Sequence, residues 1–190
     1  KSREIYPYNF NLFISYTIID EKVKITWKVE NIDSQEIYFS IGGHPAFNIS
    51  SPENLIDYYI EFKCRKNVNK INLEGPYYGE IEEIESLPIL ELNSSVFEND
   101  AIIYTNIDKV SLKSSKEEFY ININIKDFPL VGIWTPYYKD TNSTAPFICI
   151  EPWYGLADSV DSNKIYKNKK YINKLNIGES FEVSYDIEIK

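Results

Sequence analysis

The residue with the clearest chemical potential is Glu151, which directly follows four apolar residues at positions 147–150. A continuous apolar run is typical of a buried strand, because it leaves no face for water. Pro152 cannot donate a ladder hydrogen bond, so the strand is predicted to stop there or pass into a bulge. Glu151 would then lie at a strand end beside Trp153, where desolvation raises a carboxyl pKa toward values suited to a base. The alternative is a carboxylate held in a structural ion pair.

The only histidine of the chain, His44, lies between a Gly-Gly pair at positions 42–43 and Pro45. Two glycines permit backbone angles that other residues avoid, and they let another chain or a ligand approach closely. Pro45 fixes the following turn, so His44 is predicted to lie in a tight bend at the end of a strand over residues 37–41. An imidazole can transfer protons near neutral pH, but a lone histidine is also often a structural residue.

Together these two stretches resemble the aldose 1-epimerase (galactose mutarotase-like) family, and more narrowly its LacX-type branch. The resemblance rests on Gly-Gly-His-Pro-Ala-Phe at residues 42–47 and Ile-Glu-Pro-Trp-Tyr-Gly-Leu-Ala-Asp-Ser at residues 150–159. The stretches 97–103 and 132–134 are similar to that branch as well, so the likeness covers essentially the whole chain. It implies a β-supersandwich fold and the interconversion of the α and β anomers of a sugar.

The resemblance implies that Glu151 is the catalytic base and that His44 is the acid that protonates the ring oxygen. A carboxylate and an imidazole suit these roles because the pKa of each can be tuned toward neutrality. Asp100 is a candidate acceptor for sugar hydroxyls, or otherwise a turn residue that caps the next strand. Trp134 and Trp153 could offer an indole face to the apolar side of a pyranose, although either could equally be core.

The rest of the chain indicates an all-β protein. Apolar residues alternate with polar ones over residues 23–30, which predicts a half-buried strand that pairs with residues 8–19 as a hairpin. Further strands are predicted at residues 36–41, 58–62, 80–84, 101–104, 109–113, 118–125, 130–134 and 180–189. No long segment has the helical period, so residues 1–190 are predicted to form a single sandwich domain without long helices.

Composition excludes several partner classes. The net charge of the 190-residue chain is −9 and its basic residues are scattered, which argues against nucleic acid or an anionic membrane surface. No apolar run approaches the ~20 residues that cross a bilayer. Cys64 and Cys149 are predicted to be free thiols in a reducing cytoplasm. One histidine and two separated cysteines give no metal-ligand spacing, and no glycine-rich phosphate loop is present, so no metal or cofactor is expected.

The leading functional hypothesis is a cofactor-independent aldose 1-epimerase that acts on a free hexose. The chain begins Lys-Ser-Arg without any methionine, so it is predicted to be the C-terminal two-thirds of a longer protein; the resemblance implies that the upstream part adds another histidine and an arginine. A hexose-6-phosphate mutarotase is second, because phosphate recognition favours arginine and the chain has only Arg3 and Arg65. A non-catalytic carbohydrate-binding protein is the alternative from another class. The sequence specifies neither the sugar nor the oligomeric state.

Overall fold

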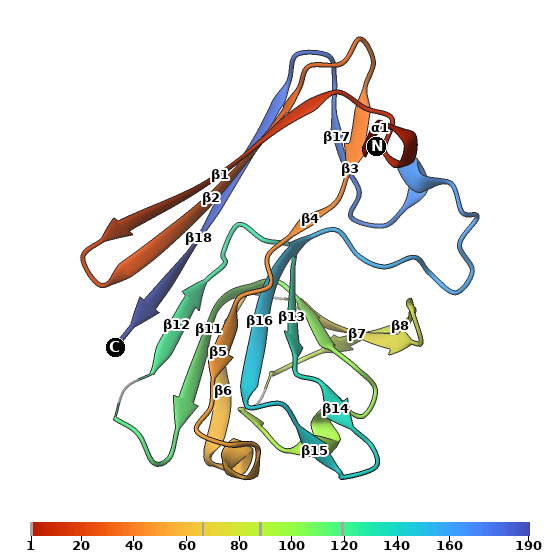
Figure 1. Ribbon diagram of the computed structural model, residues 1–190. Helices are drawn as coiled ribbons and strands as arrows, with labels where there is room; N and C mark the ends of the chain where they lie inside the picture. The colour runs from red at the N-terminus through yellow and green to blue at the C-terminus, as the bar shows by residue number, and fades with distance from the viewer. Residues whose placement is uncertain (1, 66, 88, 119) are drawn as a thin grey trace.

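The computed structural model describes residues 2–65, 67–87, 89–118 and 120–190, and these residues form an all-β fold of two large sheets (Figure 1). The helical segments are short: α1 (Ser2–Ile5) and the 3-10 turns η1 (Pro52–Asp57), η2 (Ser94–Phe97) and η3 (Tyr166–Asn168). The prediction of an all-β chain without long helices is confirmed. No helix among the described residues has the length and apolarity needed to cross a bilayer.

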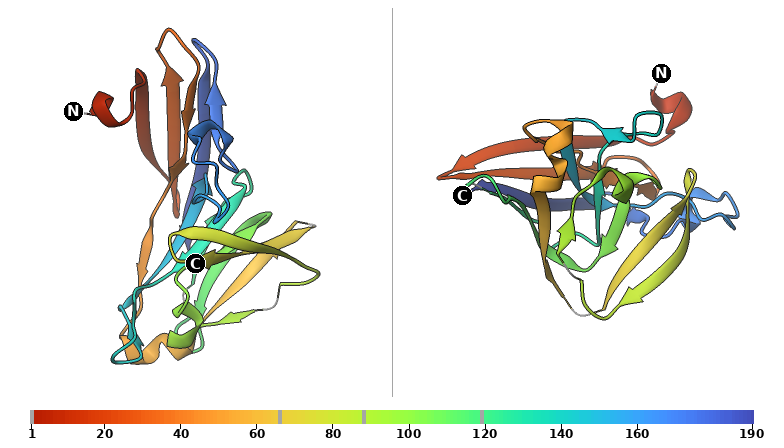
Figure 2. Two further views of the ribbon diagram at one scale, coloured as in Figure 1. Left: turned by 90° about the vertical axis from the view of Figure 1, so that its right-hand side faces the viewer. Right: turned by 90° about the horizontal axis from the view of Figure 1, so that it is seen from below.

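The first sheet contains seven strands, of which three extend away from the rest of the molecule as a long arm (Figures 1 and 2). In sheet order its strands are β1 (Phe10–Ile19), β2 (Lys22–Asn31), β18 (Ser180–Ile189), β12 (Ile121–Asn124), β11 (Ile107–Ser114), β6 (Tyr58–Cys64) and β9 (Leu90–Glu91). The β1–β2 hairpin and the final strand agree with the predictions from residue alternation.

The second sheet carries the residues with chemical potential. Its strand order is β4 (Ile41–Gly42), β16 (Phe147–Tyr154), β13 (Leu130–Trp134), β10 (Ile102–Thr105), β7 (Val68–Glu74) and β8 (Tyr77–Ile84), with β5 (Ala46–Asn48) also paired to β16. Two small ladders complete the fold, β14 (Tyr137–Tyr138) with β15 (Ser143–Thr144) and β3 (Ile37–Phe39) with β17 (Asn173–Leu175).

The main core lies between the two sheets. Ile60, Val110 and Ile123 come from the first sheet and are fully buried. From the second sheet Val131, Ile133, Ile148 and Ile150 join the same cluster, also without exposed surface. Since side chains alternate across a strand, the intervening residues of β13 and β16 face the opposite side of the second sheet. That opposite side carries Glu151 and Trp153 of β16.

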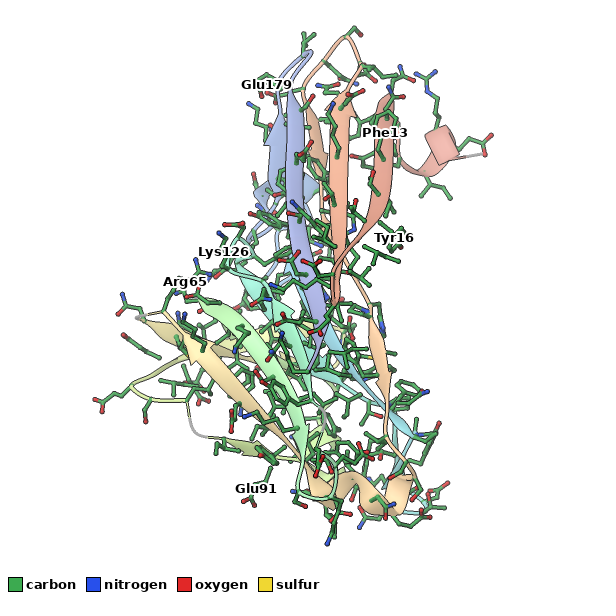
Figure 3. The ribbon with its side chains drawn as sticks, turned by 90° about the vertical axis from the view of Figure 1, so that its left-hand side faces the viewer. Phe13, Tyr16, Arg65, Glu91, Lys126 and Glu179 are labelled. Carbon is green, nitrogen blue, oxygen red and sulfur yellow. The ribbon has the colours of Figure 1, made fainter. Side chains whose placement is uncertain are left out.

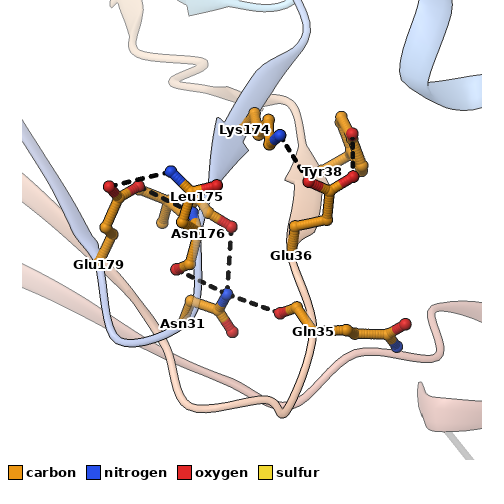
Figure 4. Close-up of polar contacts among 8 residues, drawn as sticks. All are labelled: Asn31, Gln35, Glu36, Tyr38, Lys174, Leu175, Asn176 and Glu179. Atoms are coloured by element: carbon orange, nitrogen blue, oxygen red, sulfur yellow. Dashed lines mark hydrogen bonds and ion pairs between the residues drawn. The ribbon is translucent and has the colours of Figure 1, made fainter.

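A buried amide joins the chain connections at the end of the arm that lies farthest from the rest of the molecule. Asn31, at the end of β2, is 2 % exposed, and its side-chain amide donates to the carbonyl oxygens of Gln35 (2.9 Å), Leu175 (3.1 Å) and Asn176 (2.9 Å) (Figure 4). Three acceptors for one amide group satisfy a polar side chain that would otherwise be costly to bury. This contact joins the β2–β3 connection to the β17–β18 connection, which lies about 140 residues further along the chain.

Strand β1 forms the open edge of the first sheet. It pairs with β2 on one side only, and all ten of its residues are exposed. Phe13 and Tyr16 extend from it with no strand beyond them (Figure 3), at 49 % and 71 % exposure. An edge strand that exposes this much apolar surface and carries no charged residue lacks the usual features that discourage pairing with other chains.

Three predictions about strands need correction. Strand β16 neither stops nor bulges at Pro152 but continues to Tyr154. The strand predicted over residues 36–41 is divided into β3 and β4, because the chain leaves one ladder at Ser40 and joins another. The polar stretch after residue 63 forms a full hairpin of β7 and β8, in which only part of β8 was expected.

Candidate active site

Strand β16 presents three adjacent functional groups on one face. Ile148 and Ile150 point into the main core, so the alternate residues Cys149, Glu151 and Trp153 point to the other face of the second sheet. On the neighbouring strand β13 the same face carries Gly132 opposite Glu151 and Trp134 opposite Cys149. The burial of Ile148 and Ile150 in the core therefore fixes the direction in which the Glu151 side chain points.

On the other side of β16, the segment of residues 41–48 pairs with it twice, through β4 and β5, and bends away from it between these two ladders. Gly42 pairs with Trp153, and Ala46 pairs with Cys149. Both pairs belong to the same register, so His44 lies opposite Glu151 in the interval between β4 and β5. The two candidate catalytic residues, more than a hundred positions apart in sequence, are cross-strand neighbours.

This interval also explains why Pro152 is tolerated inside β16. The Gly43 N–H donates to the Pro152 carbonyl (3.0 Å), and the Ile150 N–H donates to the Pro45 carbonyl (3.2 Å). The N–H that proline lacks would face the same side, where the Gly43–His44–Pro45 bend interrupts the ladder. Pro152 nevertheless accepts a ladder hydrogen bond through its carbonyl, and the strand continues although one donor is missing.

His44 and Glu151 form a close pair with very different exposures. Nε2 of His44 lies 3.3 Å from Oε1 of Glu151, and their side chains are 59 % and 7 % exposed. Burial raises the pKa of Glu151 above its usual value, the positive form of His44 and the hydrogen bond from Trp153 lower it, and the charge of Asp100 raises it again. A carboxyl group with a raised pKa is suited to accept and return a proton near neutral pH.

Trp153 is a wall of the site and a partner of the base. Its Nε1–H donates to Oε2 of Glu151 at 3.3 Å, so the two carboxylate oxygens have separate partners. The indole occupies space left by glycines on both neighbouring strands: a Cβ at Gly42 or at Gly132 would lie 2.7 Å from its ring atoms. The glycines therefore allow the indole to lie close to the sheet beside Glu151.

Trp134 and Asp100 complete the polar and aromatic surroundings. The Trp134 ring meets the His44 ring edge-on, with centroids 5.6 Å apart, and so limits how the imidazole can turn. Asp100 is an exposed residue with a φ of 70° just before β10, and its N–H donates to the Phe97 carbonyl at 3.1 Å. It is thus a turn residue, as one interpretation predicted, and it also lines the cavity of the site.

All five residues singled out in the sequence line one cavity of about 290 Å³. Its other walls come from elements that sequence reasoning did not connect with the site. The turn between β7 and β8 contributes Gly75 and Pro76, and the segment after β16 contributes Leu156 and Ala157. Gly75 and Pro76 form a turn, and nothing in a turn sequence shows which cavity the turn will face.

A second cavity of about 470 Å³ lies on the other side of the His44 bend. It is bordered by β1, β2 and β18, through residues such as Ile14, Ile25 and Tyr185. His44 reaches both cavities, but Glu151 and Asp100 line only the smaller one. Because proton transfer needs the base as well as the imidazole, the smaller cavity is the candidate active site.

Cys149 is a neighbour of the pair that the sequence did not associate with it. It is fully buried, and burial together with the nearby charge of Glu151 raises the pKa of its thiol to about 12. Ligand atoms of His44, Cys149 and Glu151 all lie within 4.8 Å of one another. Spacing along the chain gave no metal-ligand pattern, whereas the fold places three different ligand types together.

The chain is similar to known proteins along most of its length. The family model for aldose 1-epimerase matches residues 1–169. The chain belongs to the aldose 1-epimerase family. It is also similar to the chromosomal LacX protein of Lactococcus lactis subsp. lactis, with 31 % identity over 97 % of this chain and 63 % of that protein.

Solved structures of the family have the same fold. A galactose mutarotase related enzyme from Lactobacillus acidophilus superposes with a TM-score of 0.91 at 28 % identity, over the whole of this chain and 64 % of that one. A galactose mutarotase-like protein from Lactobacillus casei gives 0.88 at 26 % identity, over the whole of this chain and 66 % of that one. The predicted galactose mutarotase-like β-supersandwich is thereby confirmed. The chain spans about 63 % of the length of the LacX proteins.

Proposed function

We propose that this chain carries the acid/base centre of an aldose 1-epimerase that interconverts the α and β anomers of a free hexose. The observation that supports it most is the His44–Glu151 pair, at 3.3 Å, in a cavity also lined by two indoles and a carboxylate. Mutarotation needs one group at the anomeric hydroxyl and one at the ring oxygen. These two oxygens are bonded to the same carbon, so an acid and a base in contact with each other can serve both.

Ring opening follows from the roles of these two residues. Glu151 accepts the proton of the anomeric hydroxyl, and the electron pair of that O–H bond forms the C1=O double bond. The bond from C1 to the ring oxygen breaks, and the ring oxygen takes a proton from the His44 imidazolium. The aldehyde then rotates about the C1–C2 bond. Closure on its other face returns both protons, so the pair ends as it began and only proton transfers are needed.

The other residues of the cavity would hold the sugar. Trp134 and Trp153 provide apolar rings for the C–H face of a pyranose. Asp100 supplies an acceptor for sugar hydroxyl groups at the cavity margin. The Trp153 indole N–H keeps one carboxylate oxygen of Glu151 engaged, which leaves the oxygen beside His44 for proton transfer.

The free hexose is favoured over a hexose 6-phosphate. Among the cavity-lining residues that the structure describes, His44 is the only basic side chain. Arg65 instead pairs with Asp108 at 3.0 Å and donates to the Phe128 carbonyl at 3.1 Å. We further propose a cytoplasmic location, which the two free cysteines, Cys64 and Cys149, support.

The substitution Glu151→Gln separates catalysis from simple sugar binding. Glutamine keeps the shape and the acceptor for the Trp153 N–H but cannot accept the substrate proton. We expect turnover to fall by about 10²–10⁴-fold, the range for loss of a general base, while sugar affinity is largely kept. Polarimetry would measure turnover, and a titration with galactose or glucose would measure binding. Equal turnover in both proteins would exclude Glu151 as the base, and saturable binding without turnover in either would favour the binding protein.

A further inference from the structure

The mutarotation chemistry leaves one buried reactive group of the site without a role, the thiol of Cys149. Cys149 and Glu151 are two residues apart on β16 and share a face. His44 lies opposite Glu151 in the bend between β4 and β5. Their ligand atoms, one sulfur, one carboxylate oxygen and one imidazole nitrogen, lie within 4.8 Å of one another. Two of the three ligand types lie on the paired backbone of β16, which makes the arrangement more restrictive than a group of surface carboxylates.

The ligand types point to one class of ion. Hard ions such as Ca²⁺ and Mg²⁺ take oxygen ligands, whereas Zn²⁺ is bound by sulfur, nitrogen and oxygen in tetrahedral sites. With bonds of about 2.0–2.3 Å, the ligands of a tetrahedral zinc ion lie about 3–4 Å apart. The His44–Glu151 separation of 3.3 Å already satisfies this spacing. The remaining separations are at most 4.8 Å and need to shorten by no more than about 1 Å to meet the same geometry.

We propose that His44, Cys149 and Glu151 form a zinc-binding site that, when filled, removes the acid and the base from catalysis. The zinc ion would occupy the lone pairs of the His44 imidazole and of the Glu151 carboxylate. The thiol proton of Cys149 leaves to solvent as the Zn–S bond forms, and a water takes the fourth position. Binding rests on the geometry of the three residues; its inhibitory effect alone rests on the proposed function.

The exposure of the three residues defines the route of the ion. His44 is 59 % exposed and lines the cavity, while Glu151 and Cys149 lie behind it at 7 % and zero exposure. The ion is therefore expected to bind the exposed imidazole first, and then the buried carboxylate and thiol. A site of this kind fills through the same opening that the sugar uses, so zinc and sugar are expected to compete.

Cobalt is the direct probe, because Co²⁺ takes zinc sites and its bond to a thiolate absorbs in the near ultraviolet. We expect the native chain to show a saturable thiolate–cobalt band, which Zn²⁺ bleaches. Cys149→Ser should abolish the band, and His44→Ala should weaken Co²⁺ binding by about 100-fold or more, since loss of even an outer-shell partner costs up to that factor. Cys64→Ser, at a cysteine on the first sheet, is the matched control and should keep the band.

The outcomes decide metal binding and activity separately. The absence of a thiolate band in the folded native chain would overturn the proposal, as would a band that survives Cys149→Ser but disappears in Cys64→Ser. Because His44 is exposed, His44→Ala is expected to fold, which far-ultraviolet circular dichroism would check. Mutarotation by the metal-free chain is measured alongside. If that chain shows no turnover, the proposed function fails while the cobalt spectra still decide the zinc site.

Discussion

Strands β1 and β16 are similar in composition but opposite in environment. Both are rich in aromatic and β-branched residues, yet every residue of β1 is exposed, whereas residues 148–152 of β16 are buried. The difference lies in their neighbours: β1 pairs only with β2, whereas β16 is flanked by β13 on one side and by β4 and β5 on the other. Composition therefore specifies a strand, but the strands beside it decide whether that strand can bury and tune a carboxylate such as Glu151.

The largest effect that separates the two strands is expected from one matched substitution in each. Ile150 in β16 has no exposed surface, while Ile18 in β1 is 79 % exposed. Ile150→Ala should lower the free energy of unfolding by about 2–5 kcal/mol, because it removes buried surface and leaves a cavity. Ile18→Ala should change it by no more than about 0.5 kcal/mol. Urea unfolding of both variants measures the contrast, and comparable losses would show that β1 is as well packed as β16.

A second substitution tests how the neighbours of β16 shape the site. A Cβ at Gly132 would lie 2.7 Å from the Trp153 ring, so Gly132→Ala should push the indole off the sheet. We expect a loss of about 1–3 kcal/mol in unfolding free energy, as overpacking typically costs, together with slower turnover, since the indole would lose its contact with Glu151. Adding Trp153→Phe should restore part of the stability because the smaller ring relieves the clash. No change on Gly132→Ala would contradict the close contact.

The smallest expected effect concerns the pH dependence of the site. The base must be ionised, so activity falls as the pH drops through the pKa of Glu151. The charge of Asp100 helps to raise that pKa, so Asp100→Asn should lower it and move the acidic limb of kcat/KM to lower pH. Asp158→Asn is the control, because Asp158 does not line the cavity. A shift toward higher pH, or an equal shift in the control, would show that Asp100 does not act on Glu151.

Much of the fold could be predicted from local patterns in the sequence. Strand β13 at Leu130–Trp134 and strand β18 at Ser180–Ile189 have the expected bounds, because clear apolar runs or alternation mark them. Strand β7 was missed because its residues are mostly polar. Residue type alone does not show that Ile71 is buried and pairs with Ile103 of β10. The error at Pro152 has another origin: its carbonyl still accepts from the Gly43 N–H, so the strand continues although proline provides no donor.

The candidate site was predictable in part for the same reasons. Its five residues could be named because two short motifs and two further stretches resemble a known family, and the structure places all five around one cavity. The motifs do not show that His44 and Glu151 are cross-strand neighbours, since that depends on the shared register of β4 and β5 with β16. Nor do they indicate that the Trp153 indole packs over Gly132, or that the Cys149 thiol lies near His44 and Glu151.

The most direct test is the rate at which freshly dissolved α-galactose and α-glucose reach anomeric equilibrium, followed by NMR with and without the chain. We expect acceleration by the native chain and by Ile18→Ala, which changes only the exposed strand. The acceleration should be lost in His44→Ala, which removes the acid but leaves the buried strand intact. No acceleration by the native chain, or equal acceleration by His44→Ala, would contradict the claim that the His44–Glu151 pair performs the chemistry.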